Sequence, residues 1–211
     1  MTDNDIFDAL KEALGADLLA VGGAGFDCWA RVAKGRVREA LQLFKGALGF
    51  NVLVDHTAAD LSQWPGGKWT GVSDPCQATQ GSAHERGAQT DGRFELTWRL
   101  MRLNEKSGLV EGRAALKCRV SDGEAGPPSV RDLWPCADWL EREVWDMFGV
   151  KPEGRPDIKR LLLYEEFKGH PLRKDYPITK RQPLVAPLPA PEGRIAPEEL
   201  RPRVTDPGLV E

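Results

Sequence analysis

Charged residues between positions 141 and 176 are the ones whose types and spacing could do chemistry. A dense run of acidic and basic side chains is followed by five basic side chains further along: Glu141, Arg142, Glu143 and Asp146, then Arg155, Lys159, Arg160, Arg173 and Lys174. A carboxylate is costly to bury alone, but an oppositely charged group can compensate for its burial. The pattern therefore favours an interlocked, partly buried interface over an ordinary solvated charged face.

A second cluster lies at residues 169–177, with turn-forming residues at both ends. It holds a histidine, three charged groups and two side chains that can be buried: His170, Arg173, Lys174, Asp175, Leu172 and Tyr176. Proline fixes the backbone and removes a hydrogen-bond donor, so Pro171 and Pro177 favour an extended shape. We expect this segment to lie against another protein.

Hydrolysis is the main enzymatic alternative. His56, between Asp55 and Thr57, or His170 could activate a serine or cysteine nucleophile. The chain has no G-x-S-x-G nucleophile elbow, and an isolated Asp-His pair after a strand is more often a structural histidine. We therefore expect both histidines to be structural.

The sequence shows no residue spacing typical of a metal, iron–sulfur or nucleotide site. The three histidines come from unrelated segments, and the cysteines at positions 28, 76, 118 and 136 form no C-x-x-C pair. The glycine-rich run at residues 22–25 lacks the G-x-G-x-x-G spacing of a dinucleotide loop, so we interpret it as a turn. We expect no cofactor or metal in this chain, and reduced thiols that fit a cytosolic protein.

The overall charge balance disfavours two classes of partner. The chain has 211 residues, with 29 Lys+Arg against 32 Asp+Glu and a net charge of −3. No basic excess favours binding to nucleic acid or to an anionic membrane. The longest weakly apolar stretch, residues 18–26, is much shorter than the roughly 20 residues that cross a bilayer. Because the N-terminus is acidic, we expect no leader peptide and a cytoplasmic location.

The elements that must position these residues begin with two helices and two strands. Apolar residues four apart predict a helix over residues 3–14, and alternation predicts a strand over 26–32. Helical spacing returns over residues 36–48, where Gly49 can adopt the left-handed conformation that ends the helix. A short apolar run at residues 50–54 predicts a buried strand.

Two longer strands and a third helix follow. Residues 93–104 and 113–120 alternate between apolar and charged side chains, and residues 136–148 show helical spacing. Strands with one apolar and one charged face indicate an antiparallel sheet with one face packed and the other solvated or contacting a partner. The predicted fold class is α+β, a small, mostly antiparallel sheet covered by helices, with a long extended C-terminal segment.

The chain is predicted to divide into three parts. Residues 1–148 form the α+β domain, residues 149–181 an extended charged docking segment, and residues 182–211 a proline-rich tail. Within the domain, residues 62–92 are rich in glycine and poor in aliphatic side chains, so they cannot bury enough surface to order themselves. We expect a long mobile loop there.

The two charged clusters together resemble the thirty-kilodalton (C) subunit family of the proton-pumping NADH:quinone oxidoreductases (respiratory complex I). The first family motif is carried here by Glu141-Arg142-Glu143, Asp146, Met147-Phe148, Arg155, Lys159 and Leu161-Leu162. Residues 169–177 match the second motif. Arg155 departs from the family, which usually has His there; arginine keeps a donor and a positive charge but does not titrate near neutrality.

The resemblance implies a structural subunit of the peripheral arm that bears no cofactor and docks its neighbours. Those neighbours would be the 49 kDa-type (D) quinone-site subunit and the Fe-S subunits B and I. FMN and the Fe-S clusters would then lie in partner subunits, and this chain alone would not be catalytic. The complex would lie on the cytoplasmic side of the bacterial inner membrane, with this chain peripheral.

Two alternatives to this function stay open. The first is the equivalent subunit of a ferredoxin-linked quinone reductase or of a membrane-bound hydrogenase, because related complexes use a similar chain. The less favoured alternative is a stand-alone hydrolase that uses His56 or His170.

Overall fold

The computed structural model describes residues 3–62, 92–177 and 179–183. Most of the predicted loop at 62–92 and of the tail at 182–211 therefore lies outside the described residues. The chain divides into the units Met1–Lys180 and Arg181–Glu211, and the fold described below is that of the first.

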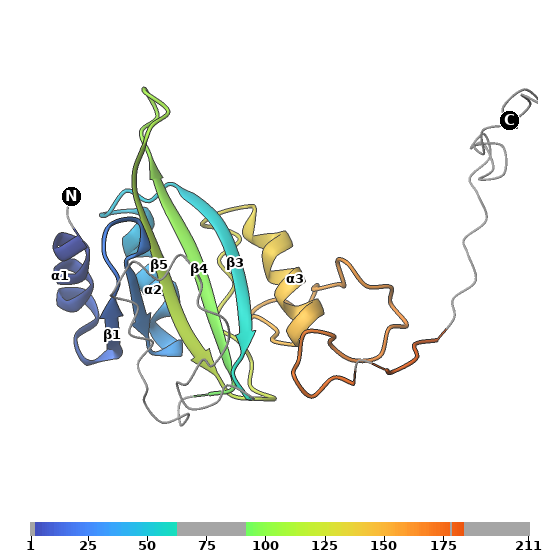
Figure 1. The fold of residues 1–211 in the computed structure, drawn as a ribbon. Helices are drawn as coiled ribbons and strands as arrows, with labels where there is room; N and C mark the ends of the chain where they lie inside the picture. The colour runs from blue at the N-terminus through green and yellow to red at the C-terminus, as the bar shows by residue number, and fades with distance from the viewer. Residues whose placement is uncertain (1–2, 63–91, 178, 184–211) are drawn as a thin grey trace, which may run out of the picture. The chain divides into compact units, whose positions relative to one another are not determined.

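A five-stranded sheet forms the centre of the fold (Figure 1). The strands are β1 (Leu18–Gly22), β2 (Trp29–Val32), β3 (Val52–Asp60), β4 (Phe94–Leu103) and β5 (Val110–Val120). They are ordered β1-β2-β5-β4-β3, and each neighbouring pair is antiparallel except β2 and β5, which are parallel. The sheet is thus mostly antiparallel, and the predicted α+β fold class is confirmed.

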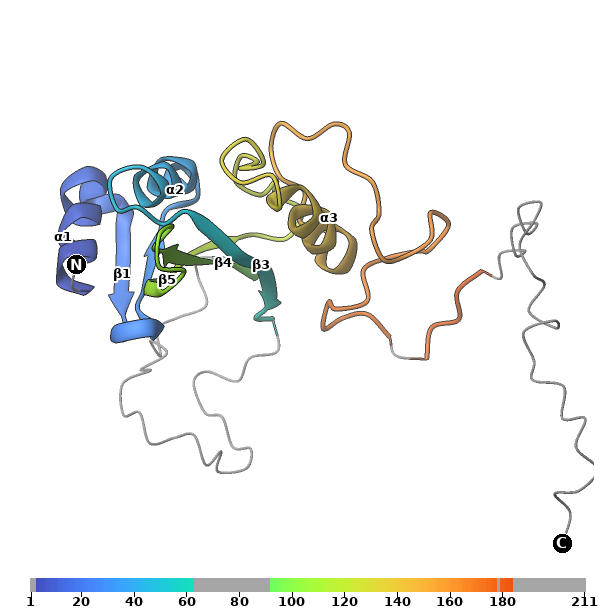
Figure 2. The ribbon, with the colours of Figure 1, turned by 90° about the horizontal axis from the view of Figure 1, so that it is seen from above.

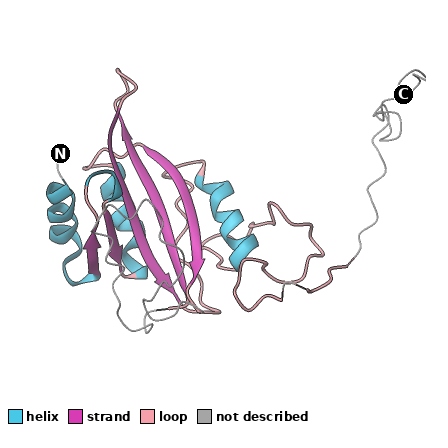
Figure 3. Cartoon of the chain, in the orientation of Figure 1, coloured by secondary structure: helices cyan, strands magenta, loops and turns pink. Residues whose placement is uncertain are grey.

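Three helices cover one face of this sheet (Figure 2). They are α1 (Asp3–Leu14), α2 (Val37–Lys45) and α3 (Ala137–Phe148), and single turns of 3-10 helix lie at Gly15–Asp17, Gly25–Asp27 and Lys34–Arg36. After α3 the described chain has neither helix nor strand (Figure 3).

The core lies between the helices and the inward face of the sheet. The inward side chains of β4 and β5 are all buried, as the alternation predicted: Phe94, Leu96, Trp98, Leu100, Ala114, Leu116, Cys118 and Val120. Helices α1 and α2 add Leu10, Leu41 and Phe44, which are also buried. Burial of this apolar surface is the main stabilising contribution to the fold.

Several local predictions differ from the structure. The strand predicted over residues 26–32 begins only at Trp29, because Gly25–Asp27 form a turn of 3-10 helix, and the strand predicted over 113–120 begins at Val110. Residues 18–22 form a strand that was not predicted, because Leu19 and Val21 are apolar yet exposed and hide the alternation. Helix α2 ends at Lys45 rather than at residue 48, and Gly49, with φ of 71°, lies in the turn that follows. Strand β3 is longer than the predicted 50–54, because β4 pairs with it as far as Asp60.

Candidate functional site

Helix α3 carries the first four residues of the first charged cluster: Glu141, Arg142, Glu143 and Asp146. Cys136 is its N-cap residue and Gly149, with φ of 77°, is its C-cap, a left-handed conformation that glycine adopts without strain. The apolar face of α3 packs on β3 and buries Val144, Met147 and Phe148. Two acidic side chains of the same helix, Glu141 and Asp146, are buried as well.

Glu141 is compensated by an arginine from the following segment. Its Oε2 accepts hydrogen bonds from Arg155 Nη1 at 3.0 Å and from the Ser129 hydroxyl at 2.7 Å, while Oε1 accepts the Val130 N–H at 2.8 Å. Arg155 is buried too, and its Nη2 pairs with Asp138 Oδ1 at 2.7 Å. Both partners of this ion pair are therefore held by further polar groups, as a buried charge requires.

Asp146 is enclosed by the backbone of the same segment. Its Oδ2 accepts the N–H groups of three consecutive residues, Leu161 at 3.1 Å and Leu162 and Leu163 at 2.9 Å each. Its Oδ1 pairs with Arg160 Nη1 at 2.6 Å. Burial alone would raise the pKa of Asp146, but the three amides and the guanidinium outweigh it and lower the pKa. The backbone of residues 161–163 therefore encloses the carboxylate of Asp146.

The remaining members of the first cluster lie at its surface. Arg142 donates to the carbonyl oxygens of Lys159 at 3.1 Å and Arg160 at 2.8 Å. The side chains of Glu143 and Lys159 are exposed. Asp146 lies one helical turn after Arg142, yet it is buried because the segment after Gly149 folds over it.

The second cluster packs against the C-terminal end of α3. His170 Nδ1 donates to the Asp146 carbonyl at 2.9 Å, the Leu172 N–H to Met147 at 3.1 Å, and Arg173 Nε to Phe148 at 2.5 Å. The last carbonyl groups of a helix have no partner inside the helix, and these three donors supply one each. Residues 170–173 thereby cap α3.

Asp60, at the end of β3, joins the second cluster to the sheet. Arg93 approaches it with both Nε and Nη2, the latter at 2.7 Å, and the Lys174 N–H donates to it at 2.9 Å. Arg93 also pairs with Asp175 at 2.8 Å and with Asp122 at 2.7 Å. Burial would raise the pKa of Asp60, but the Arg93 guanidinium and the amide donors lower it well below its usual range.

Asp60 and Arg93 were missed by the reasoning from sequence. Asp60 occupies an inward position of β3, in phase with Ala58, and a carboxylate at a core position signals a paired charge. Its partners lie 33 and 114 positions away, so no local spacing identifies them.

The structure brings the two predicted clusters together, and the two buried carboxylates of α3 are paired within the chain, whereas Glu143 and Lys159 are exposed. Of the five downstream basic residues, Arg155 and Arg160 supply counter-charges to carboxylates of α3, whereas Arg173 pairs with Asp122. Three large apolar side chains also point outward among exposed charged ones: Trp139, Leu162 and Leu172 are 62%, 62% and 51% exposed. Tyr176 stacks on Phe167 and is half-buried.

The two histidines considered for hydrolysis contact backbone carbonyls. His56 is buried, its ring stacks on Trp98 at 4.4 Å, and its Nδ1 donates to the Thr97 carbonyl at 3.2 Å. Burial lowers the pKa of His56 to about 4. His170 likewise donates a hydrogen bond from Nδ1 to a backbone carbonyl. In both histidines Nδ1 therefore binds the backbone and not a nucleophile. In residues 3–62, 92–177 and 179–183 no group of three or more His, Cys, Asp or Glu side chains could hold a metal ion.

The described helices are also informative about membranes. None of them is long and apolar enough to cross a bilayer.

Comparison with protein families gives one clear match. The family model described as respiratory-chain NADH dehydrogenase, 30 Kd subunit, matches residues 30–182. This range includes β2 except its first residue, β3 to β5, α2, α3 and both charged clusters.

Individual relatives agree with that match. NADH-quinone oxidoreductase subunit 5 of Thermus thermophilus is 34% identical over 184 residues, which cover 86% of this chain and 75% of the relative. The NADH-quinone oxidoreductase C subunit of Geobacter sulfurreducens is 31% identical over 169 residues, covering 80% and 86%. A solved structure of a trypsin-resistant fragment (1-134) of Nqo5 is 29% identical, covers 72% of this chain and 98% of the fragment, and superposes with a TM-score of 0.51.

Proposed function

The chain belongs to the 30 Kd subunit family of respiratory-chain NADH dehydrogenase, and we propose that within this complex it is a structural subunit that docks its neighbours. It is a subunit of a multi-subunit NADH-quinone oxidoreductase. The proposed neighbours are the 49 kDa-type (D) quinone-site subunit and the Fe-S subunits B and I. FMN and the Fe-S clusters are proposed to lie in partner subunits, on the cytoplasmic side of the bacterial inner membrane, in a complex that translocates protons.

The observation that carries this proposal is the apolar surface left over the two charged clusters. Trp139 on α3 and Leu162 and Leu172 after it are each at least half exposed, although the two buried carboxylates of α3 already have their cations inside the chain. Large apolar side chains over a rigid, internally paired scaffold are typical of the centre of a protein interface. This surface lies within the residues that the family model matches.

The charged side chains first considered for docking have a different proposed role, which lies within their own chain. Arg142 and Arg173 bind backbone carbonyls of their own chain, so reversing their charge would disturb the fold before it disturbed a partner. Their proposed role is to hold residues 159–173 against α3. The partner then meets the apolar groups of that surface.

The experiment compares assembly of the complex with three single variants of the full chain. Leu162→Asp and Leu172→Asp place a charge in the proposed interface, and both should lower the amount of assembled complex. Leu109→Asp, at a similarly exposed position in the turn between β4 and β5, is the matched control and should leave assembly unchanged. Native gels and the flavin content of the complex purified through a tag on this chain give the readout. Normal assembly with Leu162→Asp and Leu172→Asp would contradict the proposal.

Two alternatives are separated by the same purification. If the chain arrives with hydrogenase or ferredoxin-linked subunits and without flavin, it belongs to a related complex. If it arrives alone and cleaves esters or peptides, the hydrolase hypothesis with His56 or His170 is correct.

A further inference from the structure

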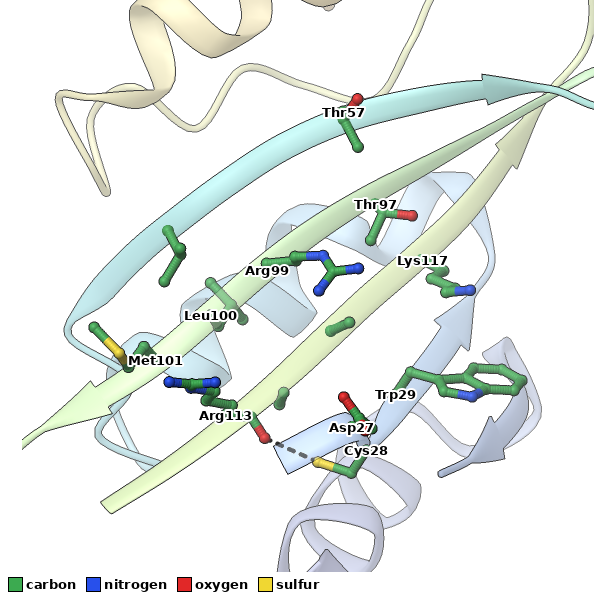
Figure 4. Close-up of a pocket in the computed structure, with 13 residues that line it drawn as sticks. Asp27, Cys28, Trp29, Thr57, Thr97, Arg99, Leu100, Met101, Arg113 and Lys117 are labelled. Atoms are coloured by element: carbon green, nitrogen blue, oxygen red, sulfur yellow. Dashed lines mark hydrogen bonds between the residues drawn. The ribbon is translucent and has the colours of Figure 1, made fainter. Parts of the chain in front are cut away.

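The face of the sheet without helices carries a groove in its middle (Figure 4). Its floor is Ala115 on β5, whose cross-strand neighbours are Trp29 on β2 and Arg99 on β4. Arg113 and Lys117 stand two residues to either side on the same strand, so they project from the same face. A small side chain surrounded by four long ones leaves a hollow of about 460 Å³.

The groove has an excess of positive charge. Lys117 pairs with Glu95 at 3.1 Å, and Arg119 shares the same carboxylate at 3.5 Å. Arg99 is exposed and stands opposite Asp55 in the β3–β4 register, yet in the described part of the chain it has no ion pair. The rim contributes one further carboxylate, Asp27.

The other walls of the groove are apolar or hold hydroxyl groups. A β-bulge at Leu53–Asp55 turns Val54 toward the groove, where it is exposed. Met101 and Trp29 complete the apolar lining, and Thr57 and Thr97 add hydroxyl groups. The surface therefore suits a ligand that combines carboxylates with short apolar groups.

We propose that this groove binds an acidic peptide segment of a neighbouring subunit of the complex. The inference rests on the proposed function, which supplies the neighbours, and adds to it a second contact surface on another face of the fold. An extended segment fits because residues of β2, β5, β4 and β3 line the groove in turn across the sheet. Asp or Glu side chains of the segment would pair with Arg99, and its apolar side chains would lie on Trp29 and Met101.

The test is photo-crosslinking in the assembled complex. The variant Met101→p-benzoylphenylalanine places a photoreactive group at the groove wall, and mass spectrometry identifies the attached peptide. The expected product is a peptide rich in Asp and Glu from another subunit of the complex. Adding Arg99→Glu should reduce this product about tenfold, and adding Arg99→Lys should largely retain it. Lys106→Glu, the same change of charge in the β4–β5 turn, is the control and should leave the product unchanged.

Other outcomes would overturn the inference. These are attachment to a second copy of this chain, attachment within the same chain, attachment to a segment without acidic residues, and no attachment. The complex is purified before irradiation, so its presence is known in every arm. A complex that contains the chain but gives no acidic adduct rejects the groove alone, whereas a chain that never enters the complex rejects the proposed function.

Discussion

The Asp60 carboxylate accepts the backbone N–H of Lys174 at 2.9 Å, although 114 positions separate the two residues. The same carboxylate binds Arg93, which also binds Asp175 next to Lys174. The end of β3 and the second charged cluster are therefore held by one network. Because Leu172 lies inside the segment held in this way, its exposed side chain is presented at a fixed position.

This network predicts a loss of stability in acid. Asp60 has a lowered pKa in the folded chain, so its contribution is present above the ordinary carboxyl pKa of about 3.9 and is lost as the pH falls through the folded value. Asp60→Asn should cost about 2 kcal/mol at pH 7, and the difference from the unmodified chain should shrink below pH 4. Urea unfolding at pH 7, 5 and 3 measures it. The control Asp8→Asn removes an exposed carboxylate on α1 and should change little. A difference independent of pH would contradict the assignment.

The amides around Asp146 predict a local change in hydrogen exchange. Without the carboxylate, the N–H groups of residues 161–163 lose their acceptor. Asp146→Ala should therefore speed their exchange about tenfold or more, since each 1.4 kcal/mol of lost protection is a factor of ten. Asp132→Ala, which removes an exposed carboxylate paired with Arg38, is the control. Equal protection in Asp146→Ala would show that another group holds this segment.

The buried pair of Arg155 and Glu141 predicts strong coupling between two substitutions. Arg155→Met leaves a buried carboxylate without its cation and should cost about 3 kcal/mol in the free energy of unfolding. Adding Glu141→Gln removes that unpaired charge, so the double variant should be more stable than the sum of the two single losses predicts. Urea unfolding of all four chains closes the cycle. Additive losses would mean that the pair contributes no coupling.

Much of the fold could be predicted from the sequence because its pattern is local. The alternation in β4 and β5 gives a period of two, and apolar residues four apart give α1 with the bounds seen in the structure. Strand β1 could not be predicted in this way. It has five residues and apolar side chains on both faces, so its sequence shows no alternation of apolar and polar residues.

The candidate site could be predicted only in part. The types of residue in the two clusters indicated paired, partly buried charges, but not which charges meet. Asp146 accepts three of its four hydrogen bonds from backbone N–H groups. Nearly every residue has such a group, so residue types do not identify these donors. Glu141 likewise depends on where Ser129 and Val130 return to α3. Such partners are set by tertiary structure, which a single sequence does not display.

The buried His56 predicts a second dependence on pH, in a different range. Its pKa is lowered to about 4 in the folded chain, whereas in the unfolded chain it should titrate near 6.5. Below pH 6.5 His56 is protonated in the unfolded chain but stays neutral in the folded chain. The free energy of unfolding therefore falls by roughly 3 kcal/mol as the pH drops from 6.5 to 4. His56→Phe keeps an aromatic ring on Trp98 but cannot titrate, so this part of the pH dependence should disappear. Urea unfolding between pH 8 and 4 gives the slope of each chain, and the values at pH 8 isolate any change in packing. If both chains lose the same stability over this range, His56 is protonated in the folded chain as easily as in the unfolded one.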